Sequence, residues 1–144
     1  MEIALAAAES AWQEHGDVPV GAVVLDPSGL VIATGVNERE LSHDPTAHAE
    51  VVAIRKAGKQ RDNWRLDGCT LVVTLEPCAM CAGAIIQSRL SKVVFGAWDE
   101  KAGAVGSVVD LIRDPRALTK VEVISGVLAE RSSALLKEFF AQSR

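Results

Sequence analysis

The sequence lacks any long apolar run and any basic leader. Its apolar stretches are short and are interrupted by glycine, proline or charged residues, so we expect no segment that spans a bilayer. The first ten residues, MEIALAAAES, contain two acids and no basic residue before the apolar positions, which argues against a signal peptide. We therefore predict a cytoplasmic protein with no membrane contact.

Cysteine and basic charge are also scarce. The chain has three cysteines, and an odd number without a secretion signal favours metal-binding or buried roles over disulfides. The formal net charge is −4, so the total charge gives no support to nucleic-acid binding, which usually shows as a basic surplus. The length of 144 residues is close to the commonest domain size. We expect one domain, residues 1–144.

Repeats and linker-like tracts are absent, and strand and helix signals follow one another along the whole chain. β-Branched runs and turn residues predict five strands, the first two joined as a hairpin by the turn signal DPSG. The strands are expected at 18–25, 30–36, 69–75, 92–97 and 120–124. Helix formers and end signals predict helices at 2–15, 46–57, 79–88 and 128–141, with Gly58 ending the second and a short one capped by Ser107 and Asp110. This order predicts a mixed, partly parallel sheet with helices on both faces.

Two cysteines stand at the start of a predicted helix, directly after a predicted buried strand. Cys78 and Cys81 are three residues apart, which places both sulfurs on one side of a helical turn. The positive end of a helix favours the thiolate form, which is the form that binds metal. Thiolates combined with imidazole are the ligands that Zn²⁺ prefers. The pattern therefore indicates a zinc site.

His48 is the predicted third zinc ligand, and Glu50 is the predicted proton carrier beside the metal. Helices that follow neighbouring strands of a parallel sheet on one face begin at the same edge, which would bring His48 to the two cysteines. Three protein ligands leave a fourth position for water, as in catalytic zinc sites. Glu50 points in another direction from the helix start, and a carboxylate beside the metal can move protons. We expect one zinc per chain.

Other interpretations of these residues stay open. A Cys-x-x-Cys pair can be a redox dithiol, although the distant His-x-Glu favours zinc. Coordination by His43 as a fourth ligand would close the site and make it structural. Cys69 begins a buried strand and is interpreted as a small core residue. Trp98 can be a platform for a stacked base or a half-buried rim residue.

Several motifs resemble those of a known family. HAE at 48–50 and PCAMC at 77–81 match the H-x-E and P-C-x-x-C signature of zinc deaminases that act on nucleobases, which defines the reaction type only. Over its whole length the chain resembles the bacterial tRNA-specific adenosine deaminases. The matching stretches are VPVGAVV (18–24), HDPTAHAE (43–50), TLEPCAMCAGAI (74–85) and SRLSKVVFGAWDEKAGAVGS (88–107). The most discriminating of these is D-x-K-x-G-A-x-G-S, from Asp99 to Ser107.

The resemblance implies a fold, an activity and a set of site residues. The fold would be the three-layer α/β/α sandwich of the cytidine deaminases, and the protein would be a homodimer. The activity would be hydrolytic deamination of adenosine to inosine at the wobble position of a tRNA anticodon loop. The implied residues are the zinc ligands His48, Cys78 and Cys81, the proton shuttle Glu50, and the substrate-binding residues Asn37, Asp99 and Lys101.

Two alternatives to this activity remain at this stage. The nearest is the same chemistry on a free base or nucleoside such as guanine or cytosine, and the other is a zinc-stabilised binding module without catalysis. If RNA is the partner, a small positive surface is enough, because RNA loops are recognised through flipped bases and local contacts. The candidates for this surface are Lys101, Arg89, Lys92, Lys137 and Arg144. We expect no DNA partner.

Overall fold

The computed structural model describes residues 1–143, which contain five strands and five helices. The strands are β1 (Gly21–Leu25), β2 (Val31–Val36), β3 (Thr70–Leu75), β4 (Lys92–Ala97) and β5 (Glu122–Ile124). The helices are α1 (Glu2–His15), α2 (Arg39–Ser42), α3 (Ala49–Arg61), α4 (Ala79–Gln87) and α5 (Ala129–Gln142). No helix in the described range is both long and apolar enough to cross a bilayer.

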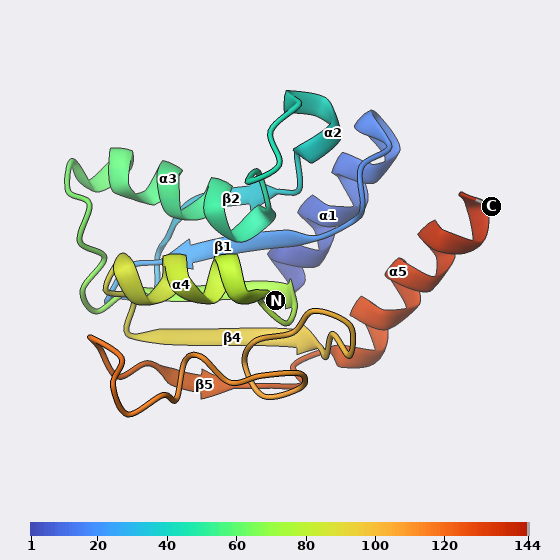
Figure 1. Ribbon diagram of the computed structural model, residues 1–144. Coiled ribbons are helices and arrows are strands. Elements are labelled where there is room, and N and C mark those ends of the chain that lie inside the picture. Colours follow the sequence, from blue (N-terminus) through green and yellow to red (C-terminus); the bar gives the residue numbers. More distant parts are fainter. Residues whose placement is uncertain (144) are drawn as a thin grey trace.

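The sheet is mixed, as predicted, with the strand order β2-β1-β3-β4-β5. β1 runs antiparallel to β2 and to β3, whereas β3, β4 and β5 are parallel to one another. Helices α3 and α4 lie side by side in front of the sheet in Figure 1, and α1 lies behind it. Helix α5 contacts α1 through an edge-to-face pair of Trp12 and Phe139. The three-layer α/β/α sandwich is therefore confirmed.

The core lies mainly between the sheet and the α3–α4 layer. β3 is buried along its central residues, as its continuous apolar run predicts, because both of its faces are covered by helices. Leu71 and Val73 of this strand are fully buried together with Phe95 of β4 and Ile85 of α4. These contacts hold α4 against β3 and β4, and they thereby determine where the first turn of α4 lies.

Close packing of α3 on the hairpin depends on a glycine. A Cβ atom on Gly35 of β2 would overlap the carbonyl oxygen of Ala49 and the amide nitrogen of Ala53, both in the backbone of α3. Backbone atoms cannot move away by changing a rotamer, so only glycine allows this approach. The first turn of α3, which includes Glu50, is therefore held directly against the sheet.

The predicted bounds of the second long helix were wrong at both ends. α3 begins at Ala49, and His48 is its N-cap residue with extended backbone angles (φ −68°, ψ 153°). The helix also continues through Gly58 to Arg61, and the N–H of its C-cap residue Asp62 caps the carbonyls of Gly58 and Lys59. An interior glycine costs a helix only about 1 kcal/mol, which the packing of α3 on the sheet overrides.

The short helix predicted from Ser107 and Asp110 does not form. The Ser107 N–H donates instead to the carboxylate of Glu76, and the Ser107 hydroxyl donates to the carbonyl of Asp99. These groups are therefore not available to cap a helix. A different short helix, α2, was not predicted from the sequence. The distant Asp17 carboxylate accepts the N–H groups of its first turn, and sequence periodicity does not reveal such a contact.

The packing of Gly35 leads to a stability prediction. Gly35→Ala should lower the free energy of unfolding by about 1–3 kcal/mol, because the new methyl group overlaps fixed backbone atoms of α3. Gly58→Ala is the matched control within α3 itself: its Cβ would lie at an ordinary 3.6 Å from the Asn63 carbonyl oxygen. The control should stabilise the protein by about 1 kcal/mol. Urea unfolding measures both, and a Gly35→Ala protein as stable as the parent would contradict this account.

Candidate metal centre and active site

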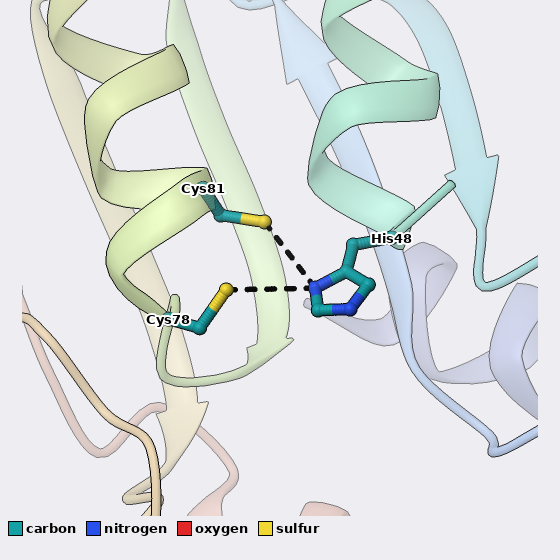
Figure 2. A group of neighbouring side chains, drawn as sticks. All are labelled: His48, Cys78 and Cys81. Atoms are coloured by element: carbon teal, nitrogen blue, oxygen red, sulfur yellow. Dashed lines mark hydrogen bonds between the residues drawn. The ribbon is translucent and has the colours of Figure 1, made fainter. Parts of the chain in front are cut away.

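Two helix starts face each other at one edge of the sheet. His48 is the N-cap residue of α3, and Cys78 is the N-cap residue of α4, directly after β3. Neither side chain makes the hydrogen bond to its own helix that an N-cap residue usually makes. Figure 2 shows both side chains, and that of Cys81, turned toward the space between the helices.

The distances among these three side chains are those of a zinc site. Nδ1 of His48 lies 3.6 Å from Sγ of Cys78 and 3.5 Å from Sγ of Cys81 (Figure 2). Usual zinc–sulfur and zinc–nitrogen bond lengths, combined at a tetrahedral angle, place sulfur and nitrogen about 3.6 Å apart. The donor set and its spacing therefore fit zinc without rearrangement. The interpretation of the cysteine pair as a redox dithiol does not account for His48 facing both sulfurs.

The cluster contains three protein ligands. The ligand atoms of His48, Cys78 and Cys81 lie within 4.8 Å of one another, and no fourth His, Cys, Asp or Glu of residues 1–143 belongs to the group. His43 is exposed and caps the carboxyl end of α2, outside the cluster. Three protein ligands are the number found in catalytic zinc sites, whereas structural sites have four.

Hydrogen bonds within the cluster shift the pKa values of all three side chains. The hydrogen bond from Cys81 lowers the pKa of Cys78 to about 4, although partial burial opposes this effect. The same interaction, together with burial, raises the pKa of Cys81 above its usual range. Its hydrogen bond with Cys78 likewise raises the pKa of His48. The lowered pKa of Cys78 favours the thiolate that binds metal, whereas the raised pKa values of Cys81 and His48 oppose metal binding, so the metal affinity depends on pH.

Glu50 lies in the first turn of α3, is only 4% exposed and lines a cavity of about 230 Å³. The same cavity is lined by His48 and Cys78, so the carboxyl group lies beside the metal ligands without belonging to their cluster. Burial raises the pKa of Glu50 to about 7, and a hydrogen bond from its own backbone N–H and the charge of His48 offset this only in part. A group with this pKa can both accept and donate a proton near neutral pH.

Two of the three predicted substrate-binding residues also line this cavity. Asn37 follows β2 and is 9% exposed, with its amide donating to the carbonyl of Val18 and accepting from the N–H of Arg39. Asp99 lines the same cavity. Its carboxylate accepts the N–H groups of Lys101 and Ala102, which forms a local turn. The structure thus gives Asp99 a role in shaping the loop that its motif did not reveal.

Lys101, the third predicted substrate-binding residue, lies outside this cavity. It lines a neighbouring cavity of about 550 Å³ together with Lys137 and Phe140 of α5. Arg89 precedes β4 and Lys92 is its first residue, so both lie at the opposite edge of the sheet, because the zinc cluster follows the carboxyl end of the parallel strand β3. Arg144 lies outside the described residues. Lys101 and Lys137 are therefore the two predicted cations that this chain places beside the site.

The sequence analysis did not identify two charged residues that line the cavity. Arg39, in α2, lines it with an exposed side chain, and nothing in the sequence marks α2 as part of the site. Glu76 lines it from the turn between β3 and Cys78 and is 1% exposed. Burial alone would raise the pKa of Glu76, but hydrogen bonds from Ser107, Asp99 and Val105 outweigh it, so the pKa is lowered. The sequence signal that could have identified Glu76 is the position of an acidic residue directly after a predicted buried strand.

Cys69 and Trp98 have the roles of packing residues within this chain. Cys69 is fully buried and accepts a hydrogen bond from Arg61 at 3.0 Å, far from the metal ligands in the fold. It is the small core residue that the sequence predicts. Trp98 is 47% exposed and packs edge-to-face on Phe95, with ring centroids 4.9 Å apart. Its exposed part borders the loop that begins at Asp99.

The chain is similar to known deaminases. Residues 1–97 match the family described as the cytidine and deoxycytidylate deaminase zinc-binding region. A tRNA-specific adenosine deaminase of Haemophilus influenzae is 47% identical over all of this chain and 83% of that protein. A solved structure from studies of A-to-I editing by tRNA:A34 deaminases at the wobble position is 43% identical, with a TM-score of 0.89 over 94% of this chain and 97% of that one. The crystal structure of guanine deaminase from Bacillus subtilis is 35% identical, with a TM-score of 0.67 over 99% and 90%.

The geometry of the cluster predicts the metal content. The parent should contain about one zinc per chain, and Cys78→Ser combined with Cys81→Ser should contain almost none, because both thiolates are lost. Cys69→Ala is the matched control, since it removes the one cysteine outside the cluster and should keep the zinc. Elemental analysis of the dialysed proteins measures this. Full zinc occupancy in the double variant would show that the ligands lie elsewhere.

Proposed function

Because the chain belongs to the cytidine and deoxycytidylate deaminase zinc-binding family, we propose that it deaminates adenosine to inosine at the wobble position of a tRNA anticodon loop. The zinc predicted from the sequence is the cofactor of this family. The observation that carries the choice of substrate is the similarity, over the whole chain, to a tRNA-specific adenosine deaminase at 47% identity.

The side chains around the cavity have separate roles in this proposal. His48, Cys78 and Cys81 hold the zinc, which when bound supplies a Lewis acid that activates a water molecule. Glu50 accepts one proton from the water, whose oxygen bonds to C6 of the adenine ring, and delivers this proton to N1. Glu50 then moves the second proton of that oxygen to the exocyclic nitrogen, the C6–N bond breaks, and ammonia leaves while C6 becomes a carbonyl. The net reaction consumes one water per adenosine, and no other reactant is needed.

The size and lining of the cavity support a flipped base as the occupant. Its volume, about 230 Å³, is below the range of about 300–1,000 Å³ for drug-sized ligands, so it suits a single base and not a whole nucleotide. Asn37, with its amide at the wall, can hydrogen-bond the base or its ribose. An unpaired loop base also costs less to extrude than a paired one.

The neighbouring cavity supports a polynucleotide substrate. The two lysines and the phenylalanine that line it, Lys101, Lys137 and Phe140, combine cations for phosphate with an aromatic side chain for a base. A free base in the active-site cavity would leave this second cavity unused. We propose that the anticodon nucleotides next to the reacting one bind there. We also propose that residues 1–144 act as one cytoplasmic deaminase domain in a homodimer.

A second candidate function is deamination of a free purine such as guanine. The 35% identity to a guanine deaminase over 99% of this chain favours this function. The zinc ligands and the proton carrier serve both reactions equally, so they do not distinguish the two substrates. The two candidates differ in what lies outside the cavity. A free base needs no surface beyond the cavity, whereas an RNA loop needs one.

The role of Glu50 predicts a separation of metal binding from turnover. Glu50→Gln keeps the size of the side chain but cannot carry the proton, so the rate should fall by at least about 10²–10⁴-fold. Zinc content and thermal stability should stay close to those of the parent, because Glu50 is outside the ligand cluster. Ammonia release and elemental analysis measure the two properties. Loss of zinc in this variant, or turnover near the parent rate, would contradict the assignment.

The proposed substrate predicts inosine in a transcribed anticodon stem-loop. The parent should convert a wobble adenosine in such a stem-loop to inosine, and should release little ammonia from free adenosine, guanine or cytosine. Nucleoside analysis by mass spectrometry detects the product. The Glu50→Gln protein, purified in the same way, is the control for a contaminating deaminase. Efficient turnover of free guanine, with none on the stem-loop, would replace the tRNA proposal by the second candidate.

A further inference from the structure

Glu76 is a buried carboxylate whose oxygens are engaged by backbone N–H groups. It is 1% exposed, and it accepts the N–H of Asp99 at 3.0 Å on one oxygen. Its other oxygen accepts the N–H of Val105 at 3.0 Å and that of Ser107 at 3.2 Å. No lysine, arginine or histidine of residues 1–143 lies within ion-pair distance of it. Three donors 23 to 31 residues away thus replace the water that this carboxylate loses on burial.

The loop from Asp99 to Ser107 is folded around the Glu76 carboxylate. We call this segment the recognition loop. The Ser107 hydroxyl donates to the Asp99 carbonyl at 2.7 Å, which closes the two ends of the loop on each other. The Ala104 N–H donates to the carbonyl of Pro77 at 2.8 Å, beside Glu76 in the chain. A Cβ atom on Gly103 would overlap the Glu76 carboxylate and the Ser107 hydroxyl. The glycine, the serine and the buried acid therefore require one another.

The recognition loop forms the boundary between the two cavities. Asp99 and Ala102 line the cavity that contains Glu50. Lys101, between them in the chain, lines the neighbouring cavity with Lys137 of α5. A change in the shape of this loop would therefore alter the wall around the reacting base and the position of the adjacent cation together.

We propose that Glu76 is a positioning residue for substrate recognition, which gives the recognition loop the shape that binds the nucleotides around the reacting base. This inference rests on the proposed RNA substrate, and it deepens that function by assigning recognition to a buried acid. Glu76 takes no part in the chemical step, because its two oxygens are occupied by the three N–H donors. The proton-carrying acid is Glu50, whose carboxyl group faces the same cavity.

The test compares Glu76→Gln with two variants of the same loop. Glutamine has one acceptor oxygen in place of two, so it leaves at least one of the three N–H groups unsatisfied. Ser107→Ala removes only the hydroxyl that closes the loop, at an exposed position where folding is not at risk. Lys101→Ala removes the cation and none of the bonds that shape the loop. Each protein is measured for zinc content, for amide hydrogen exchange, and for KM and kcat on the anticodon stem-loop.

The expected results separate positioning from stability and from chemistry. Glu76→Gln should raise KM for the stem-loop by about tenfold or more, with kcat within about threefold of the parent, and should keep its zinc. Its amide exchange should become faster at Asp99, Val105 and Ser107 and stay unchanged in β3 and β4. Ser107→Ala should shift KM and loop exchange in the same direction by less. Lys101→Ala should raise KM without changing the exchange of the loop.

Several outcomes would overturn the inference. A fall in kcat with unchanged KM would place Glu76 in the chemical step, and loss of zinc would make it a support for the metal site. Unchanged exchange in the loop of Glu76→Gln would show that the loop does not depend on the carboxylate. If the parent does not act on the stem-loop, the proposed function fails and the recognition role fails with it. The exchange data then still show whether Glu76 orders the loop.

Discussion

The structure depends on the meeting of two helix N-termini at one edge of the sheet. The N-cap residues of α3 and α4 have the side chains of metal ligands, and neither is used to cap its helix. Helix α4 is held by the core beneath it, and α3 is held by its close contact with Gly35. Two rigid elements therefore place the nitrogen of His48 within 3.6 Å of both sulfurs. Because the ligands belong to packed helices, their positions do not depend on the conformation of the surrounding loops.

The loops around the cavity are held by a different means, namely buried carboxylates. Asp17 is 2% exposed and accepts the N–H groups at the start of α2, which carries Arg39 to the cavity wall. Glu76 does the same for the loop from Asp99 to Ser107 on the other side. Loops this short cannot bury enough apolar surface to fix themselves, and unpaired N–H groups inside the protein would be costly. A buried carboxylate that accepts two or three backbone N–H groups both holds the segment in place and satisfies these N–H groups.

The zinc site and most of the fold could be predicted from the sequence, because their signals are local. Cys78 and Cys81 are three residues apart, and His48 and Glu50 are two apart. The order of strands and helices follows from short runs of β-branched residues and of helix-forming residues. The predicted helix bounds at Thr46 and Gly58 were wrong, because the packing of α3 on the sheet is a tertiary contact that the local signals do not show, and because the helix is capped at Asp62 instead of at Gly58. Long-range bonds also explain why a helix predicted after Ser107 is a loop.

The acidic net charge is compatible with an RNA substrate because of where the charges lie. Glu76 and Asp99, the acids that line the cavity besides Glu50, direct carboxylate oxygens at backbone N–H groups, which partly neutralise them. Several cations elsewhere on the surface are paired with acids, such as Arg55 with Asp44 and Arg131 with Glu2. Within residues 1–143, no carboxylate lies within ion-pair distance of the cations that line the two cavities, Arg39, Lys101 and Lys137. The net charge of the sequence counts all of these charges equally. A phosphate group near the cavity interacts most strongly with the unpaired cations around it.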